Sequence, residues 1–522
     1  MAKDSKHVGD PPKLASKPTD LLSQLPTELL MIIARLYLHL FDGNHDITYI
    51  LLLTQVNRRL RQVIVGTPDL WASFDIFDEE GYFHIARLCI ERSRLFPLEI
   101  LLRVGIPEAG SDFGDRCYDL LHPAASRIQV LRVVMFDETS FGIGQGVLAG
   151  LEMPALKEIE LQYDSLSPGD ALERIRIPRG CTNLQTLTVE GLFPTDYNSS
   201  NLKSLTLASA IYCRWSSALI SNIIVGSPHL ENLTFMGPDL VDNVADNLAS
   251  YVLPCPSLRS LAMKGGIVPS FTAGFLLALR APNLETVHVT GPHCHWYERT
   301  SGTPALWEEV IDRLEERYAR SKETFGNVRS LTIEQQHERY RHEGFFRFLM
   351  TAFPRITSLN LDQRGIDVLS VCNVEDGRRG MGWVFLNKLT IHGCPPLHAL
   401  ERLLAFFQAR GYKACNFVEG YGEERGDEGD DGEKGGGAEE NHNKEVHDED
   451  EDAGGGGDDE GAENEVQHRA GKVVAAGVRE GKSKLGFMPI ETLVIQGRRE
   501  TETATDEVLG RLRDTVESLQ IV

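Results

Sequence analysis

Several features that would indicate a particular class of protein are missing from this sequence of 522 residues. None of its nine cysteines forms a Cys-x-x-Cys pair and their number is odd, which favours reduced thiols over a disulfide framework. No stretch approaches the roughly 20 apolar residues that span a bilayer. The first twenty residues are polar and lack the apolar core of a signal peptide. These absences predict a soluble protein of the cytoplasm, the nucleus or both.

Basic charge is also scarce, and the acidic charge is concentrated in one segment. The formal net charge of the chain is −23. Residues 419–467 hold 21 aspartates and glutamates and only 3 lysines and arginines, so this segment accounts for −18 of that charge. The rest of the chain is close to neutral and lacks the concentrated basic patch of a nucleic-acid-binding domain. We therefore expect neither a nucleic-acid partner nor a membrane partner.

No motif predicts a catalytic or metal-binding site. The segment HCHW at residues 293–296 has no second ligand pair at metal-site spacing. The histidines of HERYRH, residues 337–342, are five positions apart rather than four and would not share a helix face. The segment GIGQG at residues 142–146 lacks the full spacing of a phosphate-binding loop, and we expect a flexible loop there. The chain is expected to be no enzyme and to use no metal and no cofactor.

What the sequence does contain is one short phrase, apolar-x-x-apolar-x-apolar, repeated along most of the chain. Five of the steps between successive copies are 28 residues long, and two more lie within two residues of 28. A period of this length indicates a solenoid, in which each unit buries its apolar face against its neighbours. The copies begin at Ile128, Leu156, Leu184, Leu202, Leu230, Leu258, Leu284, Val328, Ile356, Leu386 and Ile490.

Each phrase predicts a strand, and the apolar stretches between phrases, such as residues 240–253 and 345–353, predict helices. This α/β unit resembles the ribonuclease-inhibitor type of leucine-rich repeat. In that family an asparagine follows each strand, and here it is missing, so the turn after each strand loses its shared hydrogen bonds. The resemblance therefore implies an irregular horseshoe. The positions that match the asparagine are Asp164, Leu192, Ala210, Pro238, Gly266 and Pro292.

The positions between the apolar residues of each phrase should share one face of the sheet, because alternate residues of a strand point to opposite sides. In the horseshoe fold this is the concave face. Its side chains are mostly small hydroxyls and amides, which suit a wide protein-binding surface better than a deep catalytic pocket. Each one taken singly could equally be a solvated strand residue without a ligand. The predicted substrate-binding residues are Glu158, Glu160, Thr186, Thr188, Asn232, Thr234, Thr286, His288, Thr332, Asn360 and Thr390.

The longest step of the repeat contains a helical stretch at residues 395–413 and then a run rich in glycine, aspartate and glutamate. That run cannot bury enough apolar surface to fold and is expected to be disordered. It is either a tolerated solvated loop or a segment that attracts basic partners to the repeats. The expected domains are a disordered tail (1–22), a helical module (23–75), the solenoid (76–417), the disordered insertion (418–484), and a last repeat with a closing helix at 505–519 (485–522).

The helical module follows a different pattern. Pro26 and Glu28 mark the start of a helix, which then carries apolar residues on two neighbouring faces. A second apolar-periodic run extends from residue 50 to residue 64 and ends at Gly66 and Pro68. A module of some 50 residues is marginal by itself, and a helix that is apolar on two sides must be covered on both. The excess apolar face therefore predicts a binding partner.

This module resembles an F-box. The residues that carry the resemblance are Leu-Pro-x-Glu-Leu from Leu25, Val-Asn-Arg-Arg-Leu-Arg from Val56, and Pro-x-Leu-Trp ending at Trp71. The ending TPDLWASFDI is similar to F-box proteins that fungi carry in large numbers, which also join the F-box to leucine-rich-like repeats. Asn57 and Leu60 depart from the cysteine and tryptophan common at these positions. In that family the F-box binds a Skp-type adaptor and so links a substrate-binding domain to a cullin–RING ubiquitin ligase.

The resemblance implies a substrate receptor of such a ligase, with the repeats binding a protein to be ubiquitinated. Two alternatives stay open: a leucine-rich scaffold whose N-terminal helices only cap the solenoid, and an F-box protein that works with the adaptor outside a ligase. The residues implied to bind the adaptor are Leu25, Pro26, Leu29, Leu30, Ile33, Leu53, Val56, Leu60, Leu70 and Trp71.

Overall fold

The chain divides into two units, residues 1–415 together with 487–522, and residues 416–486. All residues that the computed structural model describes belong to the first unit. The predicted acidic insertion and most of the predicted tail lie outside the described residues. The described residues are 21–39, 47–105, 112–164, 173–195, 200–208, 217–237, 251–265, 269–290, 325–334, 343–362, 385–393, 397–409, 492–496, 503–513 and 518–521, with the single residues 312, 313, 316, 366, 369, 383 and 490.

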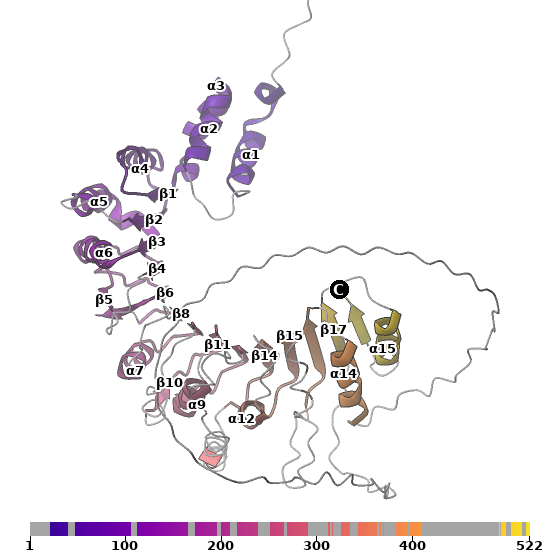
Figure 1. Ribbon diagram of the computed structural model, residues 1–522. Coiled ribbons are helices and arrows are strands. Elements are labelled where there is room, and N and C mark those ends of the chain that lie inside the picture. The colour runs from indigo at the N-terminus through magenta and orange to yellow at the C-terminus, as the bar shows by residue number, and fades with distance from the viewer. Residues whose placement is uncertain are drawn as a thin grey trace, which may run out of the picture. The chain divides into compact units, whose positions relative to one another are not determined.

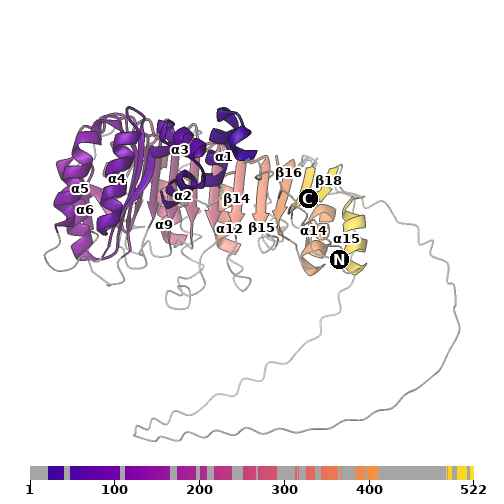
Figure 2. The ribbon, with the colours of Figure 1, turned by 90° about the horizontal axis from the view of Figure 1, so that it is seen from above.

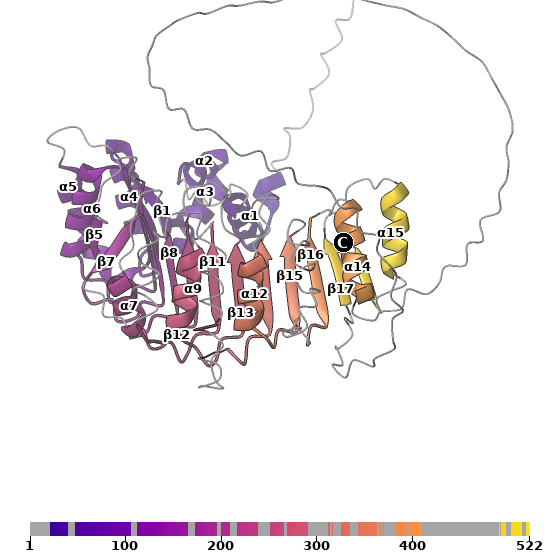
Figure 3. The ribbon, with the colours of Figure 1, turned by 60° about the horizontal axis from the view of Figure 1, so that its bottom comes forward.

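The first unit is built on one sheet of fourteen parallel strands that lie in chain order (Figure 3). All eleven predicted phrases fall on these strands; ten of them begin two residues before a strand, and the phrase at Ile128 begins with the strand itself. The strands are β1 (Ser73–Ile76), β2 (Leu98–Val104), β3 (Ile128–Met135), β4 (Glu158–Tyr163), β6 (Thr186–Glu190), β8 (Ser204–Ala208), β9 (Asn232–Met236), β11 (Ser260–Lys264), β13 (Thr286–Thr290), β14 (Ser330–Glu334), β15 (Ser358–Asp362), β16 (Lys388–His392), β17 (Thr492–Gln496) and β18 (Ser518–Ile521).

Helices accompany the sheet along one of its faces (Figures 1 and 2). Apolar residues of the strands are buried and alternate with partly exposed polar ones; in β6, Leu187 and Val189 are buried while Thr186 and Thr188 are half-buried. Burial of one side of every strand explains why the phrase recurs. The helices are α4 (Glu80–Arg92), α5 (Phe113–Leu121), α6 (Glu138–Gly150), α7 (Ser217–Val225), α9 (Pro269–Ala278), α12 (Glu343–Ala352), α14 (Leu397–Ala409) and α15 (Thr503–Arg513), with the 3-10 helix η3 (His122–Arg127).

Two small parallel sheets lie in the connections between the main strands. They pair β5 (Glu173–Arg176) with β7 (Leu192–Thr195) and β10 (Leu253–Pro254) with β12 (Leu279–Arg280). The predicted helix at residues 240–253 falls mostly outside the described residues, and its last residue, Leu253, begins β10 instead. The helices predicted at 345–353 and 395–413 are confirmed as α12 and α14.

Shared side-chain hydrogen bonds are present in the repeats, but at the turn before a strand rather than after it. In five of the described repeats, the residue directly before the first apolar position of the phrase donates to a backbone carbonyl in the turn of the preceding repeat. We call this set of bonds the ladder. It links neighbouring repeats by shared hydrogen bonds, which is the kind of bonding that was expected to be lost with the family's asparagine. Its bonds are Asn183 Nδ2 to Pro154 O (2.8 Å), Asn201 Nδ2 to Thr182 O (2.7 Å), Ser257 Oγ to Pro228 O (3.1 Å), Asn283 Nδ2 to Pro256 O (2.8 Å) and Asn327 Nδ2 to Pro282 O (2.7 Å).

The prediction of a flexible loop at residues 142–146 was wrong, because these glycines lie inside α6. Asp137 caps this helix: its carboxylate accepts from the Ser140 N–H at 2.7 Å, and the Ser140 hydroxyl accepts from the Asp137 N–H at 2.8 Å. Of these glycines, Gly144 permits close packing on the sheet. A Cβ on Gly144 would lie 2.6 Å from the sulfur of Met135 in β3.

The closing helix predicted at residues 505–519 is also corrected. The helix α15 ends at Arg513, and Ser518–Ile521 adds the strand β18 to the sheet beside β17. Leu519 and Ile521 align in register with Leu493 and Ile495 of β17. The C-terminal end of the array therefore has one strand more than the sequence pattern predicted.

The N-terminal module contains three α-helices and two 3-10 helices. The predicted second apolar run divides at Asn57, whose side chain accepts from the Leu60 N–H at 2.7 Å and caps the third helix. The module ends at Trp71, two residues before β1, and its last 3-10 helix contacts both β1 and α4. Its elements are η1 (Leu21–Gln24), α1 (Thr27–His39), α2 (Thr48–Val56), α3 (Arg58–Val65) and η2 (Pro68–Trp71).

Candidate protein-interaction surfaces

Exposed apolar side chains gather on the first two helices of the N-terminal module. On α1 the spacing of residues 29, 32, 33 and 36 places them on one face of the helix. An exposed apolar face of this kind is typical of a protein-interaction site. We call these six residues the apolar docking surface: Leu29 (45% exposed), Ile32 (47%), Ile33 (41%) and Leu36 (58%) on α1, with Leu52 (51%) and Val56 (53%) on α2.

The opposite side of α1 is packed against the chain itself. Leu30 and Ala34 are each 1% exposed and belong to the hydrophobic core, and α1 contacts both α2 and α3. Arg35 reaches across to η2, where its guanidinium lies 2.7 Å from Asp69 Oδ2. The two apolar faces of this helix therefore differ in their surroundings. The chain covers one of them and leaves the other exposed.

Trp71 joins the module to the repeats. Its ring is fully buried, its indole Nε1 donates to the Ile64 carbonyl at 2.9 Å, and the Arg92 guanidinium of α4 lies 4.3 Å from the ring centre. The contacts come from α3 on one side and from the first helix of the repeats on the other. Trp71 is thus a core residue of the junction between these two parts.

The ten residues implied to bind an adaptor separate into three groups in the structure. Pro26, Leu29, Ile33 and Val56 are exposed, and Leu25 and Leu53 are half-buried. Leu30, Leu60, Leu70 and Trp71 are buried within the chain, so their side chains stabilise the module and are not accessible to a partner in this structure. Ile32, Leu36 and Leu52 are exposed apolar residues that the family pattern did not single out, although the helical spacing on α1 identifies the first two.

The eleven predicted substrate-binding residues lie on one face of the sheet, in two rows that run across the strands. We call this surface the polar strand face. One row aligns Glu158, Thr186, Asn232 and Thr286, and the other aligns Glu160, Thr188, Thr234, His288, Thr332, Asn360 and Thr390. Most are half-buried, Asn232 and Thr286 are exposed, and Thr390 is buried.

The register adds further residues to these rows. Ser204, Ser260, Ser330 and Ser358 extend the first row, and Thr206 lies in the second. All five occupy the same positions of the phrase as the residues that were named. The signal that identifies them was therefore present in the sequence. The completed rows are dominated by hydroxyl groups from β6 to β15.

Charged groups on the polar strand face are partly paired. Arg132 of β3 lies 3.2 Å from Glu160 and 3.7 Å from Glu158, so these two acids share one guanidinium. Burial and the nearby carboxylates of Asp164 and Glu160 raise the pKa of Glu190 above its usual value. At this end the face is acidic, with Arg132 as its main counter-charge.

Near the middle of the face, Nε2 of His288 lies 3.0 Å from Oε1 of Glu334. Burial lowers the pKa of His288, and Lys264 adds to that effect, while Glu334 acts in the opposite direction. Two of the predicted residues also contact each other, because Asn360 Nδ2 donates to Thr332 Oγ1 at 3.2 Å. These side chains form an extended polar surface with small groups that a protein partner can cover.

The part of the chain that the structure describes contains no group of three or more histidine, cysteine, aspartate or glutamate side chains that could hold a metal ion. The segments at 293–296 and 337–342 lie outside the described residues. None of the described helices is both long enough and apolar enough to cross a membrane.

Comparison with known proteins finds similar chains among the solved structures. No protein-family model matches the chain, and no curated protein matches it by sequence. A leucine-rich repeat-containing protein, LegL7 from Legionella pneumophila, is similar in structure with 12% sequence identity and a TM-score of 0.32, over 59% of this chain and 87% of that one. The assignment to an α/β repeat fold with one long parallel sheet rests on the strands and register described above.

Proposed function

We propose that this chain is a substrate receptor of a Skp–cullin–F-box type ubiquitin ligase. The helices α1–α3 bind a Skp-type adaptor through the apolar docking surface, and the polar strand face binds a protein substrate. The single observation that supports this proposal most strongly is the exposed apolar face of α1, on a helix whose other face is already buried. The chain contributes proximity rather than bond chemistry, because it raises the effective concentration of substrate near the ubiquitin carrier.

The alternative is a repeat scaffold in which the N-terminal helices only cap the solenoid. A terminal cap covers the last apolar surface of the array and presents a polar exterior to water. Here η2 and α4 cover the start of the sheet, yet the exterior of α1 is apolar. The cap interpretation explains the buried residues Leu30 and Trp71, but it gives no reason for Ile33 and Leu36 to be exposed.

The test is binding of purified Skp-type adaptor to the full chain, measured by calorimetry. A variant with Ile33→Glu and Leu36→Glu should weaken binding at least about tenfold, because two apolar anchors are replaced by charges that the complex would bury. The matched control is Leu95→Glu, a leucine 90% exposed in the turn after α4. Binding by neither the wild type nor the control, with the chain folded, would refute the adaptor and favour the scaffold.

A second measurement separates a ligase subunit from an adaptor partner that works alone. If the complex of this chain and the adaptor also recruits a cullin, the ligase interpretation holds. Adaptor binding without cullin recruitment would instead support the non-ligase alternative.

A further inference from the structure

In each repeat, one residue directly precedes the residue of the first polar row, and together these preceding residues form a row of their own. The backbone N–H at this position donates to the carbonyl of the same position one repeat earlier, with distances of 2.8 to 3.0 Å along the array. Neighbouring side chains of this pre-strand row are therefore spaced by one strand, about 4.8 Å. The row consists of Gln129, Lys157, Gln185, Lys203, Glu231, Arg259, Glu285, Arg329, Thr357 and Asn387.

Toward both ends of the array, the charged members of this row have partners within the chain. Lys157 Nζ donates to Gln129 Oε1 at 3.0 Å, and the Arg259 guanidinium lies 3.8 Å from Glu285 Oε1. Arg329 donates to two backbone carbonyls at 3.2 Å each. These contacts show that side chains of this row can form hydrogen bonds and ion pairs with groups on adjacent or nearby strands.

Three consecutive members in the middle of the row differ. The side chains of Gln185, Lys203 and Glu231 have no hydrogen-bond or ion-pair partner among the described residues, although Lys203 and Glu231 carry opposite charges on adjacent strands. Lys203 is exposed and Glu231 is half-buried. An ammonium and a carboxylate thus lie side by side, each available to a ligand.

The hydrogen-bonded ladder in the preceding turn is interrupted at the same place. Its members Asn201 and Ser257 each bond to the turn before them, but His229, which lies between them in the array, makes no such bond. The step from β6 to β8 is also the shortest of the array, 18 residues between the phrases at Leu184 and Leu202. The unpaired side chains of the pre-strand row and the missing ladder bond of His229 therefore lie close to this short repeat.

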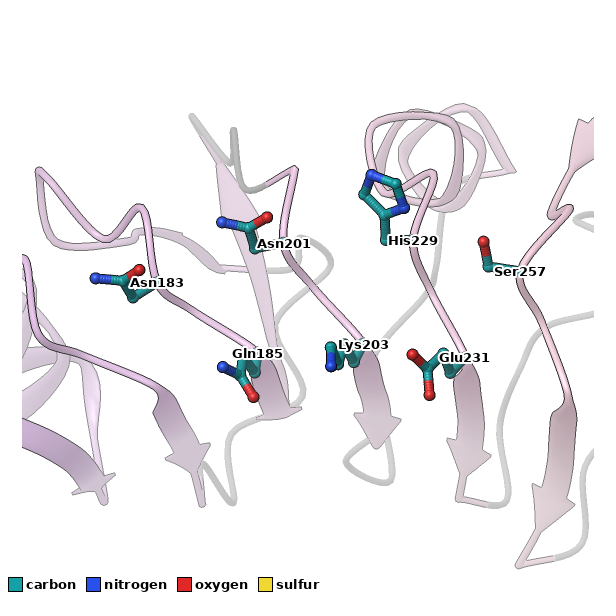
Figure 4. A pocket seen from close by; sticks show the side chains of 7 residues that line it. All are labelled: Asn183, Gln185, Asn201, Lys203, His229, Glu231 and Ser257. Atoms are coloured by element: carbon teal, nitrogen blue, oxygen red, sulfur yellow. The ribbon is translucent and has the colours of Figure 1, made fainter.

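A groove of about 390 Å³ lies at this point and is lined only by polar side chains (Figure 4). In Figure 4 the lining residues form two rows. The ladder positions lie in the turns before the strands, and the members of the pre-strand row lie near the starts of the strands. The asparagines use an Nδ2 group for the ladder and keep their carbonyl oxygens available as acceptors. The seven lining residues are Asn183, Gln185, Asn201, Lys203, His229, Glu231 and Ser257.

The chemistry of the groove indicates its ligand. A simple anion would meet the carboxylate of Glu231, and a metal ion would find one carboxylate, one imidazole and a nearby ammonium, so neither suits the site. No apolar side chain lines the groove to anchor an apolar ligand. A peptide segment carries backbone donors and acceptors for the amides and can present both an acidic and a basic side chain. Alternate side chains of an extended peptide share one side, about 6.6 Å apart.

We propose that this groove binds an extended segment of a partner protein in which an acidic and a basic residue lie two positions apart. The acidic side chain pairs with Lys203 and the basic one with Glu231, while the amide side chains bind the peptide backbone. The groove adjoins the polar strand face, since Lys203 directly precedes Ser204 and Glu231 directly precedes Asn232. The proposal does not depend on whether the N-terminal helices bind an adaptor.

The test uses full-length protein and four fluorescent nine-residue peptides with Gly/Ser flanks and the centres Asp-Ser-Lys, Lys-Ser-Asp, Asp-Ser-Asp and Ser-Ser-Ser. Fluorescence anisotropy at protein concentrations up to about 1 mM detects weak binding. One of the two mixed-charge peptides should bind at least about threefold more tightly than the other three, because the peptide direction fixes which charge meets Lys203. Lys203→Glu should remove that preference.

The charge-reversed double variant Lys203→Glu, Glu231→Lys provides the sharpest result, because it should transfer the preference to the opposite mixed-charge peptide. The matched control is Lys388→Glu, an exposed lysine of β16 on the same sheet, and it should change nothing. Circular dichroism confirms that each variant is folded. Equal binding of all four peptides, no binding by any of them, or a preference that survives the double reversal would each overturn the proposal.

Discussion

Replacing Trp71 should weaken adaptor binding by unfolding the junction rather than by removing a contact. The side chain is fully buried, donates to the Ile64 carbonyl at 2.9 Å and stacks under Arg92. A buried tryptophan changed to alanine typically costs about 3–5 kcal/mol. The Ile64 carbonyl keeps a second donor, the Thr67 N–H at 3.2 Å, so the lost hydrogen bond accounts for only about 1 kcal/mol of this.

Hydrogen exchange followed by mass spectrometry measures this effect locally. A loss of 3 kcal/mol in opening free energy accelerates exchange in α3 and η2 by more than about a hundredfold. Global unfolding would be a poor readout, because a repeat array need not unfold in a single cooperative step. Trp71→Phe keeps most of the buried ring and should give an intermediate acceleration.

The comparison that decides the point is Leu36→Ala. Leu36 is 58% exposed, so its loss should leave exchange unchanged while lowering adaptor affinity by up to about tenfold. The Trp71→Ala variant should lose affinity and protection together. If it loses affinity while exchange in α3 and η2 stays at the wild-type rate, Trp71 contacts the adaptor directly and the argument from burial is wrong.

Three further predictions follow from the repeats. Asn283→Ala removes one bond of the ladder and should lower stability by about 0.5–1.5 kcal/mol, seen as faster hydrogen exchange at the start of β13. Gly265→Ala should lower the denaturation midpoint, because φ is +81° and a Cβ would lie 2.8 Å from the Gly237 nitrogen. The control is Gly81→Ala in α4, which has nothing within 4 Å of the added Cβ and should leave the midpoint unchanged or raise it, because alanine favours a helix more than glycine does. Burial raises the pKa of the Cys89 thiol to about 12, so this thiol should resist iodoacetamide at pH 8 until the chain is unfolded. The stability that the buried neutral thiol contributes is complete below the unfolded pKa of about 8.5, and it is lost as the pH rises toward 12.

The sheet was predictable because one physical requirement produces its pattern. Each strand buries alternate residues against the helices, and the stacked repeats force the same spacing on every unit. The phrase also fits Trp71, Phe74 and Ile76 of the first strand, which the prediction overlooked because Trp71 had been assigned to the helical module. In strand β2 the buried residues Leu98, Ile100 and Leu102 are spaced two apart, because the register shifts between Leu98 and Glu99. The phrase also matches Leu95, Leu98 and Ile100 by residue type, but Leu95 is 90% exposed and this match is out of register with the neighbouring strand.

The surfaces were less predictable than the sheet, since they depend on which neighbours each side chain meets. Leu29 and Leu30 are adjacent leucines in one helix, yet the first is 45% exposed and the second 1%. Helical spacing separates them onto two faces, but only the packing of α1 on α3 determines which face is covered. The groove is a similar case. Lys157 and Lys203 occupy equivalent positions in the repeat, and only the structure shows that the first is hydrogen-bonded.

The position of Trp71 shows that a residue of the F-box-like sequence pattern can be needed to fold the N-terminal module without being accessible to a partner. The residue occupies the first apolar position of a repeat phrase, bonds to the end of α3 and lies beneath the first helix of the repeats. Any substitution there disturbs the junction from which the docking helices and the first strand both start. Four of the ten motif residues are buried in this way, and they are needed to fold the module. The side chains free to meet a partner are instead the exposed apolar residues of α1 and α2, so variants of these residues, and not of Trp71, can separate binding from stability.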